Sequence, residues 1–289
     1  MLIRRMRPAD VAVAEHVSAE AFLALAPAPS EPGPPSRRSD VRAERWRRRA
    51  AHILRHDAEG CWVAEDQDAV VGIALALRRE DLWGLSAYGV LPGLQGSGIG
   101  KALLEAAIGY GAGCLRGMIC SSHDPRAARR YRAAGFTLHP AMELSGVVDR
   151  SVLPLVDGVR DGSSADLDLC DSIDRQVRGA GHGPDHAFLM EFSALLVCDQ
   201  LTGSGYCHVV DGSPALLAAT SRRVASRLLW EALARSAPAA SVSIGDVTAE
   251  QEWAVDIALA AGLTVRNDGY VCLRHMRPPT PYLPSAHFL

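Results

Sequence analysis

The spacing of apolar residues changes along the chain and predicts an ordered series of strands and helices in the first half. Runs that are apolar throughout or at every second position predict strands at 2–6, 61–65, 70–77, 82–90 and 115–120. Apolar positions three and four residues apart predict helices at about 8–25, 37–54 and 98–110, with a shorter helix inside 123–136. The stretch from 61 to 90 should form an antiparallel meander. A helix separates the strands at 82–90 and 115–120, so we expect these two to be parallel.

The second half repeats this order in a weaker form. Its patterns predict helices at 168–178, 221–234 and 249–261, and strands at 194–198, 205–210 and 241–244. Gly262-Leu263 follows the last helix as Gly135-Phe136 follows the helix within 123–136. A repeat of this length predicts two domains of similar fold, 1–147 and 148–289. The expected class is α/β (α+β), with each domain a mixed, mostly antiparallel twisted sheet flanked by helices.

Composition narrows the class of protein. Apolar residues make up 48% of the chain and charged residues 22%, and no apolar run approaches the ~18 residues that span a bilayer. We therefore expect a soluble, cytoplasmic protein without membrane contact. The formal net charge of −3 gives no general attraction to nucleic acid. Seven cysteines without a C-x-x-C pair predict neither a disulfide framework nor a zinc site.

Three local patterns are predicted to be structural. Five prolines between 26 and 35 predict a mobile loop. The arginines between Arg37 and Arg49 alternate with acidic residues and predict a solvated helix face. His52 and His56 are four residues apart but have no third ligand nearby, so surface histidines are expected and no metal site is predicted.

The stretch from Val90 to Leu104 carries the strongest chemical signal. A strand ends there, a glycine-dense loop follows, and an amphipathic helix begins. Such a loop lets successive main-chain N–H groups point at one anion, and the positive end of the helix adds to the attraction. A Walker loop would need glycine where Gln95 stands and Ser or Thr where Ala102 stands, and a G-x-G-x-x-G fingerprint begun at Gly96 would need glycine at Lys101. Both of these phosphate-binding motifs are excluded.

The sequence Gln-Gly-Ser-Gly-Ile-Gly at 95–100 instead resembles the acyl-CoA loop of the GNAT superfamily of N-acetyltransferases. A second motif of that family is similar to residues 123–136, in which Tyr131, Gly135 and Phe136 match. The resemblance implies acetyl-CoA as acyl donor and no metal. The cofactor-binding residues that it implies are Val90, Leu91, Gln95, Gly96, Ser97, Gly98, Ile99, Gly100, Lys101 and His123. His123 stands where the family often has asparagine.

The resemblance also implies a reaction and leaves part of it open. Tyr131 matches the family tyrosine that protonates the departing thiolate, and its structural alternative is a buried aromatic anchor. The expected activity is transfer of an acetyl group to a primary amine by direct attack in a ternary complex. The acceptor is a small molecule or a peptide or protein lysine, and the oligomeric state is open. The family's glutamate base has no counterpart between Leu82 and Val90, which leaves a water relay or a group from the second domain.

The second domain is predicted to have lost the cofactor. Its loop is expected at 211–220, where one glycine remains, Pro214 lacks a main-chain donor and Asp211 adds negative charge. No tyrosine stands between Trp253 and Gly262. We expect one acetyl-CoA per chain, with the second domain as scaffold or acceptor-site wall. The alternative for the whole protein is a non-catalytic acyl-CoA sensor or interaction module.

Overall fold

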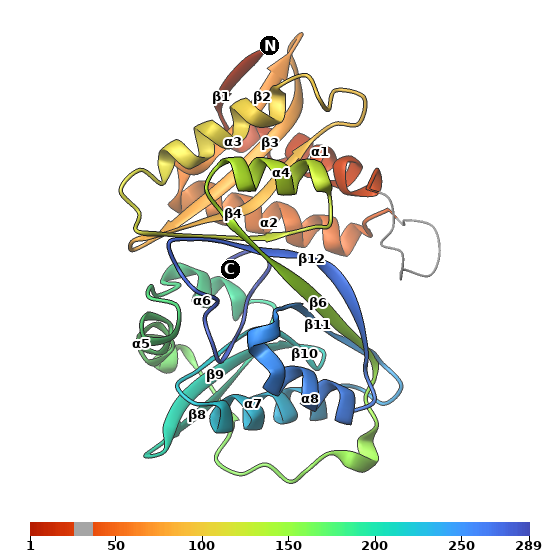
Figure 1. Ribbon diagram of the computed structural model, residues 1–289, viewed down its shortest axis with the longest axis vertical. Coiled ribbons are helices and arrows are strands. Elements are labelled where there is room, and N and C mark those ends of the chain that lie inside the picture. Colours follow the sequence, from red (N-terminus) through yellow and green to blue (C-terminus); the bar gives the residue numbers. More distant parts are fainter. Residues whose placement is uncertain (26–36) are drawn as a thin grey trace.

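The computed structural model describes residues 1–25 and 37–289. It confirms the expected mixed class, with two largely antiparallel sheets flanked by helices (Figure 1). The proline-rich stretch expected to form a mobile loop lies outside the described residues. Among those residues, no helix is long and apolar enough to cross a bilayer.

The larger sheet has the strand order β1-β2-β3-β4-β5-β12-β6-β11. Its strands are β1 (Leu2–Arg5), β2 (Cys61–Asp66), β3 (Ala69–Arg79), β4 (Leu82–Val90), β5 (Arg116–Ser121), β6 (Thr137–Val147), β11 (Ser241–Val247) and β12 (Thr264–Arg274). The helices of this half are α1 (Val11–Leu23), α2 (Asp40–His56), α3 (Ile99–Tyr110) and α4 (Pro125–Ala133). Helices α1 and α2 pack with one core cluster on the sheet, and α3 and α4 pack with another.

The smaller sheet has the order β13-β10-β9-β8-β7. Its strands are β7 (Arg160–Asp161), β8 (Ala194–Gln200), β9 (Gly203–Val210), β10 (Ser213–Ala219) and β13 (Tyr282–Leu283). The helices of the second half are α5 (Leu167–Val177), α6 (Pro184–Leu189), α7 (Arg222–Ala234) and α8 (Glu252–Ala260). Helix α7 packs on β9 and β10, and α5 contacts the same two strands. Helix α8 packs on α7 and on strands β6 and β12.

The two halves exchange strands. Strand β12 lies between β5 and β6, so the last long strand of the chain completes the sheet of the first half. Strand β6 in turn lies between β12 and β11, both from the second half. In Figure 1, β6 and β12 cross the middle of the molecule and connect its upper and lower parts. The larger sheet is therefore built from both halves of the chain.

The order of elements repeats, and so does a local ion pair. In each half two helices precede a three-stranded meander, a helix, a strand, a second helix and a long final strand. Arg4 pairs with Asp10 (2.7 Å), and Arg160 pairs with Asp166, again six residues later (2.5 Å). Both aspartates also accept a hydrogen bond from a main-chain N–H three residues earlier. These matching caps fix the entry to α1 and to α5 in the same way.

A buried ionic network joins the two halves of the chain where α6 packs against β3 and α2. The Arg79 guanidinium on β3 donates two hydrogen bonds to Asp185 of α6 (2.7 Å each) and one to Asp57 (2.8 Å). His52 of α2 is also hydrogen-bonded to Asp185 (2.8 Å) and stacks on Phe188. The surface position expected for His52 is therefore wrong, because α6 covers this face of α2. His56, one turn later, is exposed.

Candidate active site

Strands β4 and β5 are parallel, as predicted, but pair only over their first residues. Their register runs from Leu82↔Arg116 to Leu85↔Ile119, and beyond that point the strands separate. Ser86 is an extra residue on β4, because the β3–β4 register passes from Leu85 to Ala87 across it. Such a bulge bends a strand away from its neighbour. The separation opens the larger sheet between β4 and β5.

A cavity of about 550 Å³ occupies this opening. It is lined by residues of α1, β4, the glycine loop, α3, β5 and α4: Ala21, Phe22, Leu25, Leu85, Ser86, Ala87, Tyr88, Gly89, Val90, Gln95, Gly96, Gly100, Ile119, Cys120, Ser121, Ser122, Asp124, Arg126, Ala127, Arg129, Arg130, Tyr131 and Ala133. Leu91 donates its N–H to Val71 on β3 (2.9 Å). The alternation of an antiparallel ladder therefore turns the peptide groups of Tyr88 and Val90 toward the cavity. These groups can pair with an extended ligand as an added strand would.

The glycine loop forms an open cradle at the mouth of the cavity. Gly96 has φ 88° and Gly98 has φ 93°, a region that side chains with a Cβ rarely adopt. A Cβ at either position would meet no heavy atom within 4 Å, so the space beside the main chain is open. Gly98 is the N-cap of α3 and no side chain caps it, which leaves the first N–H groups of the helix available to an anion.

Of the ten expected cofactor-binding residues, four line the cavity and six do not. Val90, Gln95, Gly96 and Gly100 line the cavity. The Gln95 amide donates to Val90 O (3.0 Å) and accepts from Arg126, which fixes the loop against α4. The remaining six do not line the cavity: Leu91, Ser97, Gly98, Ile99, Lys101 and His123. Ile99 belongs to the core, and Lys101 is exposed beside Glu105 (3.7 Å).

Three arginines that the sequence analysis did not single out bring positive charge to the cavity. Arg126, Arg129 and Arg130 all line it from α4. Their spacing of three and four residues places them on one helical face, which is a signal readable from sequence. Arg126 is partly neutralised by Asp124 (3.0 Å). The cavity nevertheless gains net positive charge at the same end as the glycine cradle.

Tyr131 lies at the inner part of the cavity and is 4% exposed. Its ring lies 6.2 Å from that of Tyr88, and its hydroxyl lies beside the side chain of Ser121. Burial, with Tyr88 nearby, raises the pKa of Tyr131 well above its ordinary value. The hydroxyl therefore keeps its proton at neutral pH and can act as a donor.

The acidic residues before β4 face other partners. Glu80 pairs with Arg175 (2.7 Å), and Asp81 pairs with Arg116 (2.7 Å). Trp83 is buried and donates to Ala107 O (2.9 Å). Ser86 Oγ is buried at the bulge and has no hydrogen-bond partner among the described residues. The cavity wall of β4 thus offers an orphaned hydroxyl but no carboxylate.

Comparison with known proteins identifies the family to which residues 21–136 are similar. Residues 21–136 match the model of the acetyltransferase (GNAT) family, a range that spans α1, the meander, the glycine loop and α4. Residues 21–136 form a GNAT acetyltransferase domain. No curated protein matches the chain in sequence.

Solved structures match the fold over nearly the whole chain. A putative acetyltransferase from Pyrococcus horikoshii is similar with a TM-score of 0.75 at 17% identity, covering 99% of this chain and 94% of that one. A GCN5-related N-acetyltransferase from Sphaerobacter thermophilus is similar with a TM-score of 0.58 at 16% identity, covering 96% of each chain. Eis1 from Mycobacterium abscessus is similar with a TM-score of 0.54 at 16% identity, covering 95% of this chain and 73% of that one. At these identities the likeness establishes the fold.

The second half differs from the GNAT domain where the cavity would lie. The loop expected at 211–220 is wrong: Asp211 and Gly212 form the tight turn between β9 and β10, both with positive φ, and 213–219 is strand β10. Short hairpins favour turn residues with positive φ. Gly212 was therefore assigned to a ligand-binding loop although it belongs to a hairpin turn. The connection from β10 to α7 is only Thr220 and Ser221, and Ser221 Oγ caps the helix by accepting from Val224 N (3.4 Å).

In the second half, β10 and β11 are the counterparts of β4 and β5. The C-terminal segment of the chain fills the place between them. Strand β13 pairs with β10 through Leu217↔Leu283 and Ala218↔Tyr282, and it contacts β11 on its other side. Pro281 O accepts a hydrogen bond from Ala219 N (3.3 Å). Main-chain groups that would face a ligand are thus paired with the C-terminal segment.

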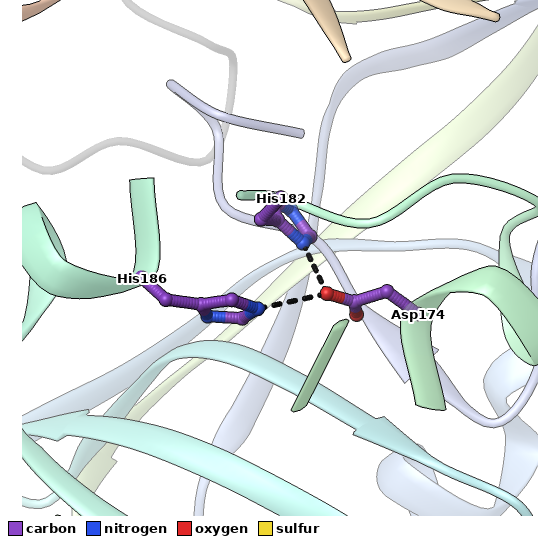
Figure 2. Close-up of side chains that lie close together, drawn as sticks. All are labelled: Asp174, His182 and His186. Carbon is purple, nitrogen blue, oxygen red and sulfur yellow. Dashed lines mark hydrogen bonds and ion pairs between the residues drawn. The ribbon is translucent and has the colours of Figure 1, made fainter. Parts of the chain in front are cut away.

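Figure 2 shows a buried cluster of one aspartate and two histidines, which has the composition of a metal site. Asp174 of α5 accepts hydrogen bonds from His182 (2.7 Å) and His186 of α6 (2.9 Å), and all three side chains are fully buried. The other Asp174 oxygen accepts from Tyr206 (2.5 Å), and His182 Nε2 lies 2.8 Å from Leu289 O. Their potential ligand atoms lie within 4.8 Å of one another, so the three residues could hold an ion. Hydrogen bonds within the protein already satisfy the Asp174 carboxylate.

Proposed function

We propose that the protein transfers the acetyl group of acetyl-CoA to the nitrogen of a primary amine, with donor and acceptor bound together. The supporting observation is one cavity that joins an open glycine cradle at its mouth to a buried, protonated tyrosine hydroxyl inside. The family of the domain supports acyl transfer in general. A small-molecule amine is the proposed acceptor, with a peptide lysine as the alternative.

The residues of the cavity fit the shape and charge of the acyl donor. Main-chain N–H groups of 95–101 would hold the pyrophosphate, assisted by the arginines of α4. The peptide groups of Tyr88 and Val90 would pair with the pantetheine amides. The bound donor supplies an activated acyl group, and the protein contributes mainly orientation of the two reactants.

Tyr131 is proposed to donate its proton to the leaving sulfur. Its side chain is buried in the cavity wall, and its hydroxyl lies beside Ser121. A positioned acid of this kind is worth ~10² to 10⁴ in rate. We further propose that the second half is a degenerate GNAT-like domain, consistent with the repeated element order and with the opening that β13 fills.

Replacement of Gly98 by valine tests the cradle. A Cβ would find open space but force the residue into a strained φ and crowd the approaching phosphates, so binding of acetyl-CoA should be lost. Gly113→Val is the matched control, because Gly113 has φ 91° and the same open space but lies beyond the end of α3. Isothermal titration with acetyl-CoA measures both variants.

Unchanged affinity in Gly98→Val would contradict the assigned site. Turnover of acetyl-CoA by the wild type is measured in parallel with a panel of primary amines, by release of the free thiol. Tight binding without turnover on any amine would favour the acyl-CoA sensor instead.

A further inference from the structure

Two β-bulges meet beside the cavity end of β5. The register of β11 on β6 shifts between Ile244 and Val247, and that of β12 on β6 shifts between Asn267 and Tyr270. Asp246 lies in the first bulge with φ 54°. Bulges bend a strand and redirect its side chains, and they are common next to active sites.

The bulge in β12 is pressed against β5. Gly269 lies in it with φ 67°, and a Cβ there would stand 1.9 Å from Ser121 O. The sheet folds so sharply here that Asp246 reaches Cys120 of β5, although β12 and β6 lie between their strands. The Cys120 thiol lies beside the Asp246 carboxylate, and Cys120 lines the cavity. Gly245, next to Asp246, faces open space.

The groups around Asp246 are mostly acidic. Asp268 faces it from β12 and Glu143 from β6, and the thiols of Cys120 and Cys272 lie near it. Glu143 is itself paired with Arg266 (2.6 Å). Burial, followed by repulsion from Asp268 and Glu143, raises the pKa of Asp246 to about 7, although the nearby Cys120 thiol acts in the opposite direction. Asp246 is half-buried, so protons can still reach it.

Asp246 and Tyr131 contact two consecutive residues of β5 that line the cavity, although Asp246 itself is not part of the lining. Consecutive residues of a strand point to opposite faces, and Cys120 contacts Asp246 whereas Ser121 contacts Tyr131. Cys120 and Tyr131 both line the same cavity. Ser86 Oγ lines it as well, is 9% exposed and lacks a partner among the described residues, which indicates that a polar ligand group belongs there.

We propose that Asp246, contributed by the second half of the chain, is the general base for a cationic amine acceptor. This role rests on the proposed acetyl transfer. The amine nitrogen gives one proton to the Asp246 carboxylate, directly or through one water, and forms its bond to the acyl carbon. The carbon–sulfur bond then breaks, the sulfur takes the Tyr131 proton, and the nitrogen releases its second proton to solvent. Solvent afterwards removes the proton from Asp246 and restores that of Tyr131.

The first test uses the ligand-free protein. A carboxyl whose pKa is raised by folding stabilises the fold while it is protonated, and that stability is lost as the pH rises through its folded pKa. The free energy of unfolding of the wild type, relative to Asp246→Asn, should therefore fall between about pH 4 and pH 7. A difference that stays constant from pH 4 to pH 8 would overturn the assignment of a neutral-range carboxyl.

The second test uses the amine of the panel that is acetylated fastest. At pH 7, Asp246→Asn should lower kcat/KM by about 10²-fold or more while the Kd of acetyl-CoA changes less than twofold. Asp246→Glu should restore part of the activity, which an unfolded variant could not do. Asp268→Asn removes one repulsive charge and should move the acid limb of the pH profile to lower pH. Glu252→Gln, on the exposed start of α8, should leave the profile unchanged.

The outcomes separate the two levels of the proposal. Turnover with an unchanged rate and pH profile in Asp246→Asn would overturn the base while leaving acetyl transfer intact. Failure of the wild type to acetylate any amine would overturn the acetyltransferase and this role with it.

Discussion

Arg79 connects the two halves through buried ion pairs, so its replacement should lower the free energy of unfolding. The guanidinium is 6% exposed, and its partners Asp185 and Asp57 are 0% and 2% exposed. Replacement by methionine roughly keeps the volume of the side chain but removes three hydrogen bonds to carboxylates and two to the main-chain oxygens of Arg78 and His182. Burial by itself raises the pKa of Asp185, and the hydrogen bonds of His52 and Arg79 overcome that effect to hold it below its ordinary value.

Without Arg79, the Asp185 carboxylate keeps His52 as its remaining side-chain hydrogen-bond partner among the described residues. Breaking a buried pair by removing one member typically costs ~3–5 kcal/mol, because the other charge is left uncompensated. We expect a loss in that range for Arg79→Met, measured by urea unfolding at pH 7 with circular dichroism and tryptophan fluorescence in parallel. Arg47→Met is the matched control: Arg47 pairs with Glu44 on the exposed face of α2 (2.8 Å), where such pairs contribute ~1 kcal/mol or less. Equal losses in the two variants would refute the reasoning.

Two further predictions concern the cavity and its missing counterpart. Tyr131→Phe should preserve packing but lower kcat at saturating acetyl-CoA by at least about tenfold, with the Kd of acetyl-CoA little changed; unaltered turnover would leave the buried tyrosine as a packing residue. Isothermal titration should give one acetyl-CoA per chain, because β13 pairs with the part of β10 that a second ligand would need, and a stoichiometry of two would show that the C-terminal segment can be displaced.

The sequence was most informative where local pattern decides the structure. The bounds of β4 and the start of α3 follow from a run of apolar residues and from glycines that few other residues could replace. The parallel pairing of β4 and β5 followed from the helix between them. The glycine at 212 was misread because a phosphate loop and a hairpin turn both favour positive φ, and only the pairing of β9 with β10 distinguishes them.

What the sequence did not predict depends on distant contacts. Nothing in the pattern of β12 says that it pairs with β5 and β6, since hydrophobic alternation fixes the faces of a strand but not its neighbours. The burial of His52 depends on α6, more than a hundred residues later in the chain. Asp246 lies near the cavity only because two bulges fold the sheet. From the sequence, the base could be predicted only as an unspecified group from the second domain.

The exchange of β6 and β12 has a consequence for how the protein is made. The arrangement is that of a domain-swapped pair, here joined in a single chain. Until residues 264–274 have been synthesised, β5 has only β4 beside it and β6 lacks β12; before residues 241–247 are made, β6 lacks β11 as well. At ~5–20 residues per second this interval lasts roughly 10–30 s after β5 has been made. Unpaired strand edges are templates for association with other chains. We therefore expect this protein to be most prone to aggregation during synthesis, while its first half is complete and β12 is not yet available.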